Sequence, residues 1–273
     1  MFIDLVTYDS GVPGIEISRL LDILLLFMFA MIRIGAFIMA APITGARFVP
    51  VQVRIVTSVI LTLPVMAYAQ LPTVEALTSP AIVGMVLGEI ALGASSGLIL
   101  SIFFAAAAVA GDRIATTAGL GFASQVDPTN GATAPVISQL FSLGLLVLFV
   151  STDSHLTAFR LVLDSYNHIP PGTVFDFSGV AQAGIDAGGQ MFAHATKLMM
   201  PVVSVLLLVN MGIGVMTRSA PQLNIFSFGF PLTLSVTMVL LYLGAPVMGL
   251  AYNKLIEAAI NALTQMLTGA ANG

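Results

Sequence analysis

The chain has 273 residues, of which 58% are hydrophobic and only 8% are charged, with nine Lys and Arg against thirteen Asp and Glu. A water-soluble domain carries about 25% charged residues, so this composition excludes an ordinary soluble enzyme. The chain has no basic run of the kind that binds nucleic acid. It also has no cysteine, which excludes disulfides, thiolate metal sites and a Cys nucleophile. We therefore expect an integral membrane protein.

Apolar stretches recur along the chain, and about 20 residues are needed to cross a bilayer as a helix. In chain order the stretches cover residues 20–41, 54–70, 81–111, 136–151, 192–217 and 231–252. The second is marginal in length, whereas the third has 31 residues and exceeds a straight crossing. Pro64, Pro201 and Pro246 predict kinks within three of the helices. We predict an all-α membrane protein with five or six hydrophobic helices.

The remaining segments are predicted as connections. Residues 1–18 form a short N-terminal leader, whose first charges are acidic and therefore unlike a secretory signal. Residues 112–130 read as a loop or broken helix, because they combine glycines with the turn sequence from Asp127 to Asn130. Residues 152–178 contain Pro170-Pro171-Gly172 and predict a water-exposed connection, and residues 253–273 an amphipathic tail. The whole chain, residues 1–273, is expected to form a single domain.

Ser95 lies in the sequence Gly93-Ala-Ser-Ser-Gly97, which has the G-x-S-x-G pattern of hydrolases. An intramembrane hydrolase would need a partner base such as His155, His168 or His194. The pattern lies inside a long apolar stretch with no strand before it. We favour a close helix–helix contact built on the small residues Gly93 and Gly97, a spacing that Gly84 and Gly88 repeat.

Arg33, Glu89 and Lys197 are ionisable residues at or near membrane depth, where such groups face protein or water. They could form an ion path, or paired charges that fix the register between helices or subunits. We favour pairing, because no ladder of acidic residues recurs along one face. Three scattered histidines provide no metal-ligand set, so we expect neither a metal nor a cofactor, and no enzymatic activity.

Four stretches resemble one family when taken in order. They are Arg33 followed by Pro42; Gly88-Glu89 followed by Gly93 and Gly97; Gly111 leading to Gly121-Phe-Ala-Ser-Gln-Val-Asp-Pro128; and Arg218-Ser-Ala-Pro-Gln-Leu-Asn-Ile-Phe226 followed by Gly229-Phe-Pro-Leu232. This combination resembles the FliR family of type III secretion export-gate subunits, from about Arg19 to the last helix.

The resemblance implies kinked helical hairpins packed in a hetero-oligomeric helical ring with FliP-like and FliQ-like membrane subunits, wrapped by an FlhB-like subunit. The ring would be the inner-membrane channel for unfolded flagellar substrates, needed for flagellum assembly. It would lie in the flagellar basal body of the bacterial inner membrane and project toward the periplasm. Its partners would be lipid and unfolded secreted proteins, with no nucleic acid. A stand-alone secondary transporter or ion channel is the alternative.

The resemblance also assigns hypothetical roles to residues. The loop that plugs the resting channel would contain Gly119, Gly121, Phe122, Gln125, Asp127 and Pro128. Packing between helices or subunits would involve Arg33, Pro42, Gly84, Gly88, Glu89, Gly93, Gly97, Arg218, Pro221, Gln222 and Asn224.

Overall fold

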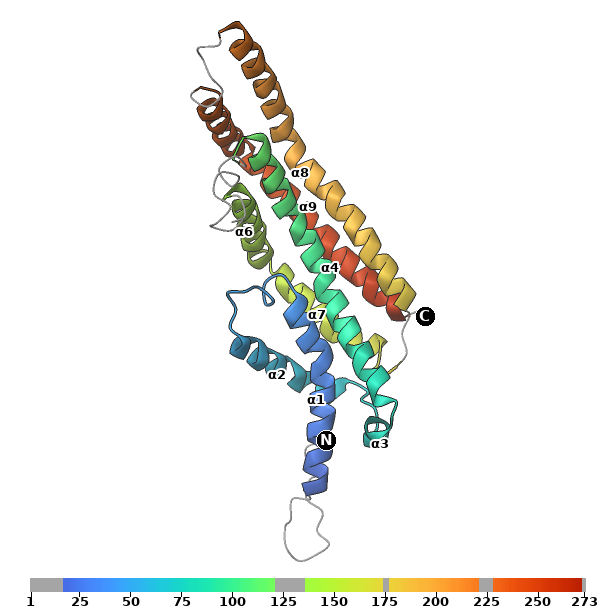
Figure 1. Cartoon of the computed structure of the whole chain (residues 1–273). Helices are drawn as coiled ribbons and strands as arrows, with labels where there is room; N and C mark the ends of the chain where they lie inside the picture. Colours follow the sequence, from blue (N-terminus) through green and yellow to red (C-terminus); the bar gives the residue numbers. More distant parts are fainter. Residues whose placement is uncertain (1–16, 121–135, 174–176, 221–227, 272–273) are drawn as a thin grey trace, which may run out of the picture. The chain divides into compact units, whose positions relative to one another are not determined.

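The computed structural model describes residues 17–120, 136–173, 177–220 and 228–271 (Figure 1). Its helices are α1 (Ile17–Ala40), α2 (Val51–Tyr68), α3 (Val74–Thr78), α4 (Ile82–Thr117), α6 (Val136–Ser151), α7 (Ser154–His168), α8 (Phe177–Ser219) and α9 (Phe230–Ala271). These ranges contain no β-strand. Five helices are long and apolar enough to cross a membrane, or up to six if the bent pair α6–α7 is one span. The predicted all-α membrane class is confirmed.

Several helices are longer than the apolar stretches that predicted them. Helix α8 has 43 residues and α9 has 42, and each continues through its proline, Pro201 or Pro246. At 1.5 Å per residue these helices are roughly 60 Å long, about twice the hydrocarbon thickness. The predicted C-terminal tail is the end of α9, and it buries Leu255, Ile256, Ala259 and Leu263 at helical spacing.

The prediction of a water-exposed connection over residues 152–178 was wrong. Helix α7 occupies Ser154–His168 and follows α6 at a bend of 68°. Its polar composition hid an amphipathic pattern, because Ala158, Val162 and Tyr166 recur at every fourth position and are buried. Helix α7 is therefore part of the packed structure.

The chain divides into two compact units. Unit 1 comprises Met1–Ser101, Leu156–Ile185 and Ile260–Gly273, and unit 2 comprises Ile102–His155 and Asp186–Ala259. Within unit 1, α1 packs against α2 and α3. A single domain over residues 1–273 stays a prediction.

Helix α2 in unit 1 exposes apolar side chains and buries polar ones, which is the opposite of a helix in a soluble protein. Ile55, Ile60 and Leu63 are more than half exposed, whereas Ser58 and Thr62 are buried. The two buried hydroxyls donate to carbonyls one turn earlier on α2, at 2.8 and 2.7 Å, so their burial leaves no unpaired donor. An exposed apolar face of this kind has to be covered by lipid or by another protein.

Candidate functional site

A buried ion pair joins α1 and α4 in unit 1. Arg33 is 1% exposed and Glu89 is 2% exposed. Nε of Arg33 donates to Oε2 of Glu89 at 2.8 Å, and Nη2 donates to Oε1 at 3.0 Å. Two parallel hydrogen bonds between a guanidinium and a carboxylate fix orientation as well as distance. The packing role predicted for these two residues therefore has a defined geometry within the chain.

Helix α7 and the segment after it complete the surroundings of the pair. Arg33 also donates to Oγ of Ser165 and to the carbonyl of Ile169, each at 3.0 Å. Its guanidinium carbon lies 4.4 Å from the ring centroid of Tyr166, in cation–π range. The Tyr166 hydroxyl donates to the carbonyl of Ala30 at 2.6 Å. We call Arg33, Glu89, Ser165 and Tyr166 the charge cluster.

Glu89 has a third donor, the backbone N–H of Gly172, at 3.2 Å from Oε1. Gly172 has φ +85°, and a Cβ there would lie 3.3 Å from Sδ of Met85. The positive φ and the close methionine both favour glycine. Through Arg33 and Glu89, the charge cluster thus binds both ends of the segment from Ile169 to Gly172, which directly follows α7.

Glycines at two positions of α4 allow it to approach α1 closely. A Cβ on Gly93 would overlap the Arg33 carbonyl and lie 2.9 Å from Cβ of Ala36, and one on Gly97 would lie 2.7 Å from Cβ of Ala40. Next to this contact, Ser101 donates to the carbonyl of Ala40 at 2.7 Å. The small residues of the hydrolase-like pattern therefore form a helix–helix contact.

The other predicted packing residues lie elsewhere. A Cβ on Gly84 would meet no atom within 4 Å, so Gly84 takes no part in the α1–α4 contact. Gly88 is half-buried beside Glu89, and Pro42 is half-buried in the turn after α1. Arg218 is exposed in the last turn of α8, and Pro221, Gln222 and Asn224 lie outside the described residues. Contacts of these residues with neighbouring subunits stay predictions.

Ser95 has the surroundings of a packing residue. Its hydroxyl donates to the carbonyl of Leu92 at 3.1 Å and lies 3.9 Å from Sδ of Met266. Neither contact is with a general base, which a serine nucleophile needs within hydrogen-bond reach.

The end of α4 in unit 2 is fixed from two sides. Gly119 has φ +89°, and the amides of Gly119 and Leu120 donate to the carbonyls of Thr116 and Ala115. This is the pattern of a helix terminated by a glycine in the left-handed region. Asn210 on α8 and Thr233 on α9 donate to the carbonyls of Thr117 and Ala118, each at 3.0 Å.

Gly119 is thus the residue that ends α4. The other predicted plug residues, Gly121, Phe122, Gln125, Asp127 and Pro128, lie outside the described residues.

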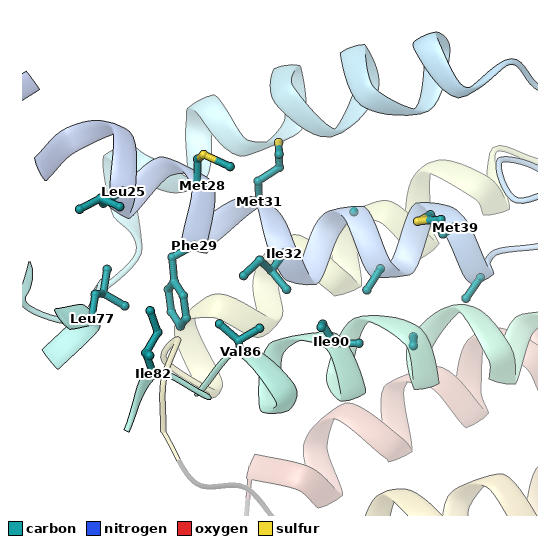
Figure 2. A pocket seen from close by; sticks show the side chains of 14 residues that line it. Leu25, Met28, Phe29, Met31, Ile32, Met39, Leu77, Ile82, Val86 and Ile90 are labelled. Carbon is teal, nitrogen blue, oxygen red and sulfur yellow. The ribbon is translucent and has the colours of Figure 1, made fainter. Parts of the chain in front are cut away.

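An open apolar groove of about 740 Å³ lies along α1 in unit 1. Figure 2 shows Phe29 and Ile32 of α1 pointing toward Val86 and Ile90 of α4, with Leu77 of α3 at one end. The lining side chains are hydrophobic, without a charged or hydrogen-bonding group, so the groove offers no group for acid–base chemistry. In the described ranges no group of three His, Asp or Glu side chains is arranged to hold a metal ion.

Buried ion pairing, glycine-mediated helix contacts and an apolar exterior define a multi-helix membrane protein. The family model described as "Bacterial export proteins, family 1" matches residues 24–259, and the chain belongs to this family. It is 33% identical over 242 residues to the flagellar biosynthetic protein FliR of Pectobacterium carotovorum subsp. carotovorum, covering 89% of this chain and 92% of that protein.

Two further relatives carry the same name. The FliR protein of Escherichia coli K12 is 30% identical, over 89% of this chain and 93% of its own length. That of Bacillus subtilis 168 is 27% identical, over 92% of this chain and 97% of its own length. The resemblance to the FliR family is confirmed.

Sequence reasoning missed four residues of these sites. Ser165 and Tyr166 were assigned to a connection, although the helical spacing of α7 carried a signal for their burial. Asn210 and Thr233 were counted only as parts of apolar helices. A polar side chain in such a helix predicts a partner at that depth, and for both residues the partner is the end of α4.

Proposed function

We propose that this chain is a non-enzymatic subunit of the flagellar type III protein export gate. With FliP-like and FliQ-like subunits it forms the inner-membrane channel through which unfolded flagellar proteins leave the cytoplasm, and an FlhB-like subunit contacts the assembly. The observation that carries the proposal is the similarity, over about nine tenths of the chain, to proteins named flagellar biosynthetic protein FliR.

The geometry of the chain supports a role in assembly. Exposed apolar side chains run along α2, α8 and α9, and helices of about 60 Å offer more apolar surface than one bilayer crossing covers. The charge cluster is closed by hydrogen bonds from Arg33 on α1 to acceptors on α4, on α7 and in the segment after α7, and from the Gly172 amide to Glu89. This arrangement suits a structural contact that holds the helices together better than a path for ions. The assembly would sit in the basal body and project toward the periplasm.

Gene deletion in the bacterium that encodes this chain tests the proposal. We expect the deletion strain to lack flagellar filaments and to regain them from a plasmid copy. Normal flagella in the deletion strain would contradict the flagellar assignment. Normal flagella together with loss of protein injection into host cells would instead assign the chain to an injectisome.

The variant Ser95→Ala distinguishes the export role from the hypothesis of an intramembrane hydrolase. Since, within the part of the chain that the structure describes, the Ser95 hydroxyl has its hydrogen-bond contacts with Leu92 and Met266, we expect the variant to support normal motility. Loss of motility in a normally assembled complex would favour hydrolase chemistry at Ser95.

A further inference from the structure

Helix α7 has an apolar face and a polar face on opposite sides. Ala158, Val162 and Tyr166 are buried. The exposed polar residues of α7 are Thr157, Arg160, Asp164, Asn167 and His168, and Leu156 is the one exposed apolar residue of this fully described helix. Thr157, Arg160, Asp164 and Asn167 follow one another at three- and four-residue intervals, which places them on one side of the helix. We call these four residues the α7 polar face.

The neighbouring helix α2 exposes the opposite chemistry. Its large exposed side chains include Ile55, Val56, Ile60 and Leu63. The C-terminal end of α2 lies against α7, where the Tyr68 hydroxyl donates to the Leu163 carbonyl at 2.9 Å. Two neighbouring helices of unit 1 therefore face different surroundings, which are apolar outside α2 and polar outside α7.

Contacts with α1 place the α7 polar face beside an apolar helix of membrane-spanning length. The rings of Phe159 and Phe37 have centroids 5.5 Å apart, and the Tyr166 hydroxyl bonds to the carbonyl of Ala30. Phe159 and Tyr166 are seven positions apart, as are Ala30 and Phe37, so α7 runs antiparallel along about 10 Å of α1. That part of α1 lies inside the candidate span Arg19–Ala40.

The charges of the α7 polar face exclude contact with lipid. The side chains of Arg160 and Asp164 are 84% and 55% exposed, and Nε of Arg160 lies 3.9 Å from Oδ2 of Asp164. Charged side chains in hydrocarbon are costly and turn toward protein or water. The centre of a stable protein interface is depleted in charged residues, so a permanent contact with a partner subunit is disfavoured as well. Water is the surrounding that fits both residues.

An open depression of about 520 Å³ lies between α2 and α7 on this side of the unit. Tyr68 and Phe159 supply aromatic rings to its lining, and Arg160, Asp164 and Asn167 supply donors and acceptors. An extended polypeptide carries a backbone N–H and C=O at almost every residue, whatever its sequence. The depression offers hydrogen bonds and ring contacts to such a chain, and its two charges balance each other.

We propose that the α7 polar face borders the water-filled path of export, and that the unfolded chain in transit contacts it at this depression. The proposal rests on the proposed function, because it names the surface that the exported chain would meet. Polar surface beside a span-length apolar helix is tolerated where it lines a water-filled cavity. Balanced charges and small polar groups suit cargo of varied sequence, since they form neither a large apolar patch nor a patch of one charge sign.

Single cysteines test the proposal, since the chain has no cysteine of its own. Thr157→Cys and Asn167→Cys lie on the α7 polar face, and Val56→Cys and Ile60→Cys on α2 are matched controls that are 56% and 58% exposed in the parent. Each variant is co-expressed with its partner subunits and purified in lipid nanodiscs. The complex is prepared empty, and also with a flagellar substrate that a tightly folded C-terminal fusion domain stalls in the channel. The probe is a cationic, water-soluble methanethiosulfonate.

The thiolate is the reactive form and apolar surroundings disfavour it, so we expect about tenfold faster labelling at positions 157 and 167 than at 56 and 60. The stalled chain should slow labelling severalfold at positions 157 and 167 and leave both controls unchanged. Asn167→Cys alone carries the test if Thr157→Cys does not assemble.

Three results would overturn the proposal while leaving the export function intact. They are slow labelling at positions 157 and 167 in the empty complex, equally fast labelling at the α2 controls, and fast labelling on α7 that the stalled chain does not change. Failure of the substrate to copurify with the complex would instead contradict the export function, and the proposal with it.

Discussion

Arg33 and Glu89 are paired where water is excluded, and this burial determines how much each residue contributes to the stability of the protein. Transfer of a charge from water into protein costs several kcal/mol, and a good partner offsets that cost. Four hydrogen bonds leave the Arg33 guanidinium, to Glu89, Ser165 and Ile169. Because each acceptor lies on a different element, loss of one charge affects α1, α4 and α7 together.

Glu89→Gln is expected to destabilise the assembled protein strongly. The amide keeps the shape of the carboxylate but leaves the buried guanidinium without a counter-charge, which costs about 3–5 kcal/mol. The chain has no tryptophan, so the loss is measured as a lower melting temperature by circular dichroism of the purified complex.

Asp164→Asn is the matched control. Asp164 also pairs with an arginine, Arg160 on α7, but at 3.9 Å and with both side chains more than half exposed. Exposed pairs of this kind contribute about 0–1 kcal/mol, so the control should melt like the parent. Equal melting temperatures for Glu89→Gln and Asp164→Asn would refute a stabilising role for the charge cluster.

At the scale of helices, the contact between α1 and α4 depends on residues without side chains. Gly93 and Gly97 lie one turn apart on α4, and each faces the backbone of α1. The charge cluster is on the same pair of helices, because the carbonyl that Gly93 approaches belongs to Arg33. Close packing of the two helices therefore also sets the geometry of the ion pair.

Gly93→Ala and Gly97→Ala are expected to weaken assembly. A methyl group at either position would push the helices apart, at a cost of about 1–3 kcal/mol. Gly84→Ala on the same helix is the control, because its Cβ would enter open space and a helical alanine gains about 0.5–1 kcal/mol over glycine. The yield of intact complex in size-exclusion chromatography measures the effect. A lower yield for Gly84→Ala than for Gly93→Ala would contradict the proposed contact.

The end of α4 defines the residue at which the predicted plug segment begins. Gly119 ends the helix, and Asn210 and Thr233 hold its last carbonyls. Deletion of residues 121–125 keeps this anchor and shortens the segment that would close the channel. We predict increased ion conductance of the reconstituted complex, with the Ser95→Ala complex as control. Unchanged conductance in an intact complex would show that the segment does not close the path.

At the scale of the whole molecule, composition and the apolar stretches were sufficient to predict an all-α membrane protein. They underestimated α8 and α9, because a helix can continue beyond its apolar part where small or amphipathic residues follow. The pairing of Arg33 with Glu89 was predictable in kind, since both lie at membrane depth. The participation of Ser165 and Tyr166 in the charge cluster was not predictable, because their helix has the composition of a loop and their contacts join residues more than 130 positions apart.

The central claim is that this chain functions as one subunit of a hetero-oligomeric export gate. Co-expression with its FliP-like and FliQ-like partners, gentle extraction and native mass spectrometry test it most directly. We predict that the chain is recovered in a stable complex that contains both partners, and that Glu89→Gln lowers the yield of that complex. A monomeric chain that transports an ion or small solute alone would contradict the account.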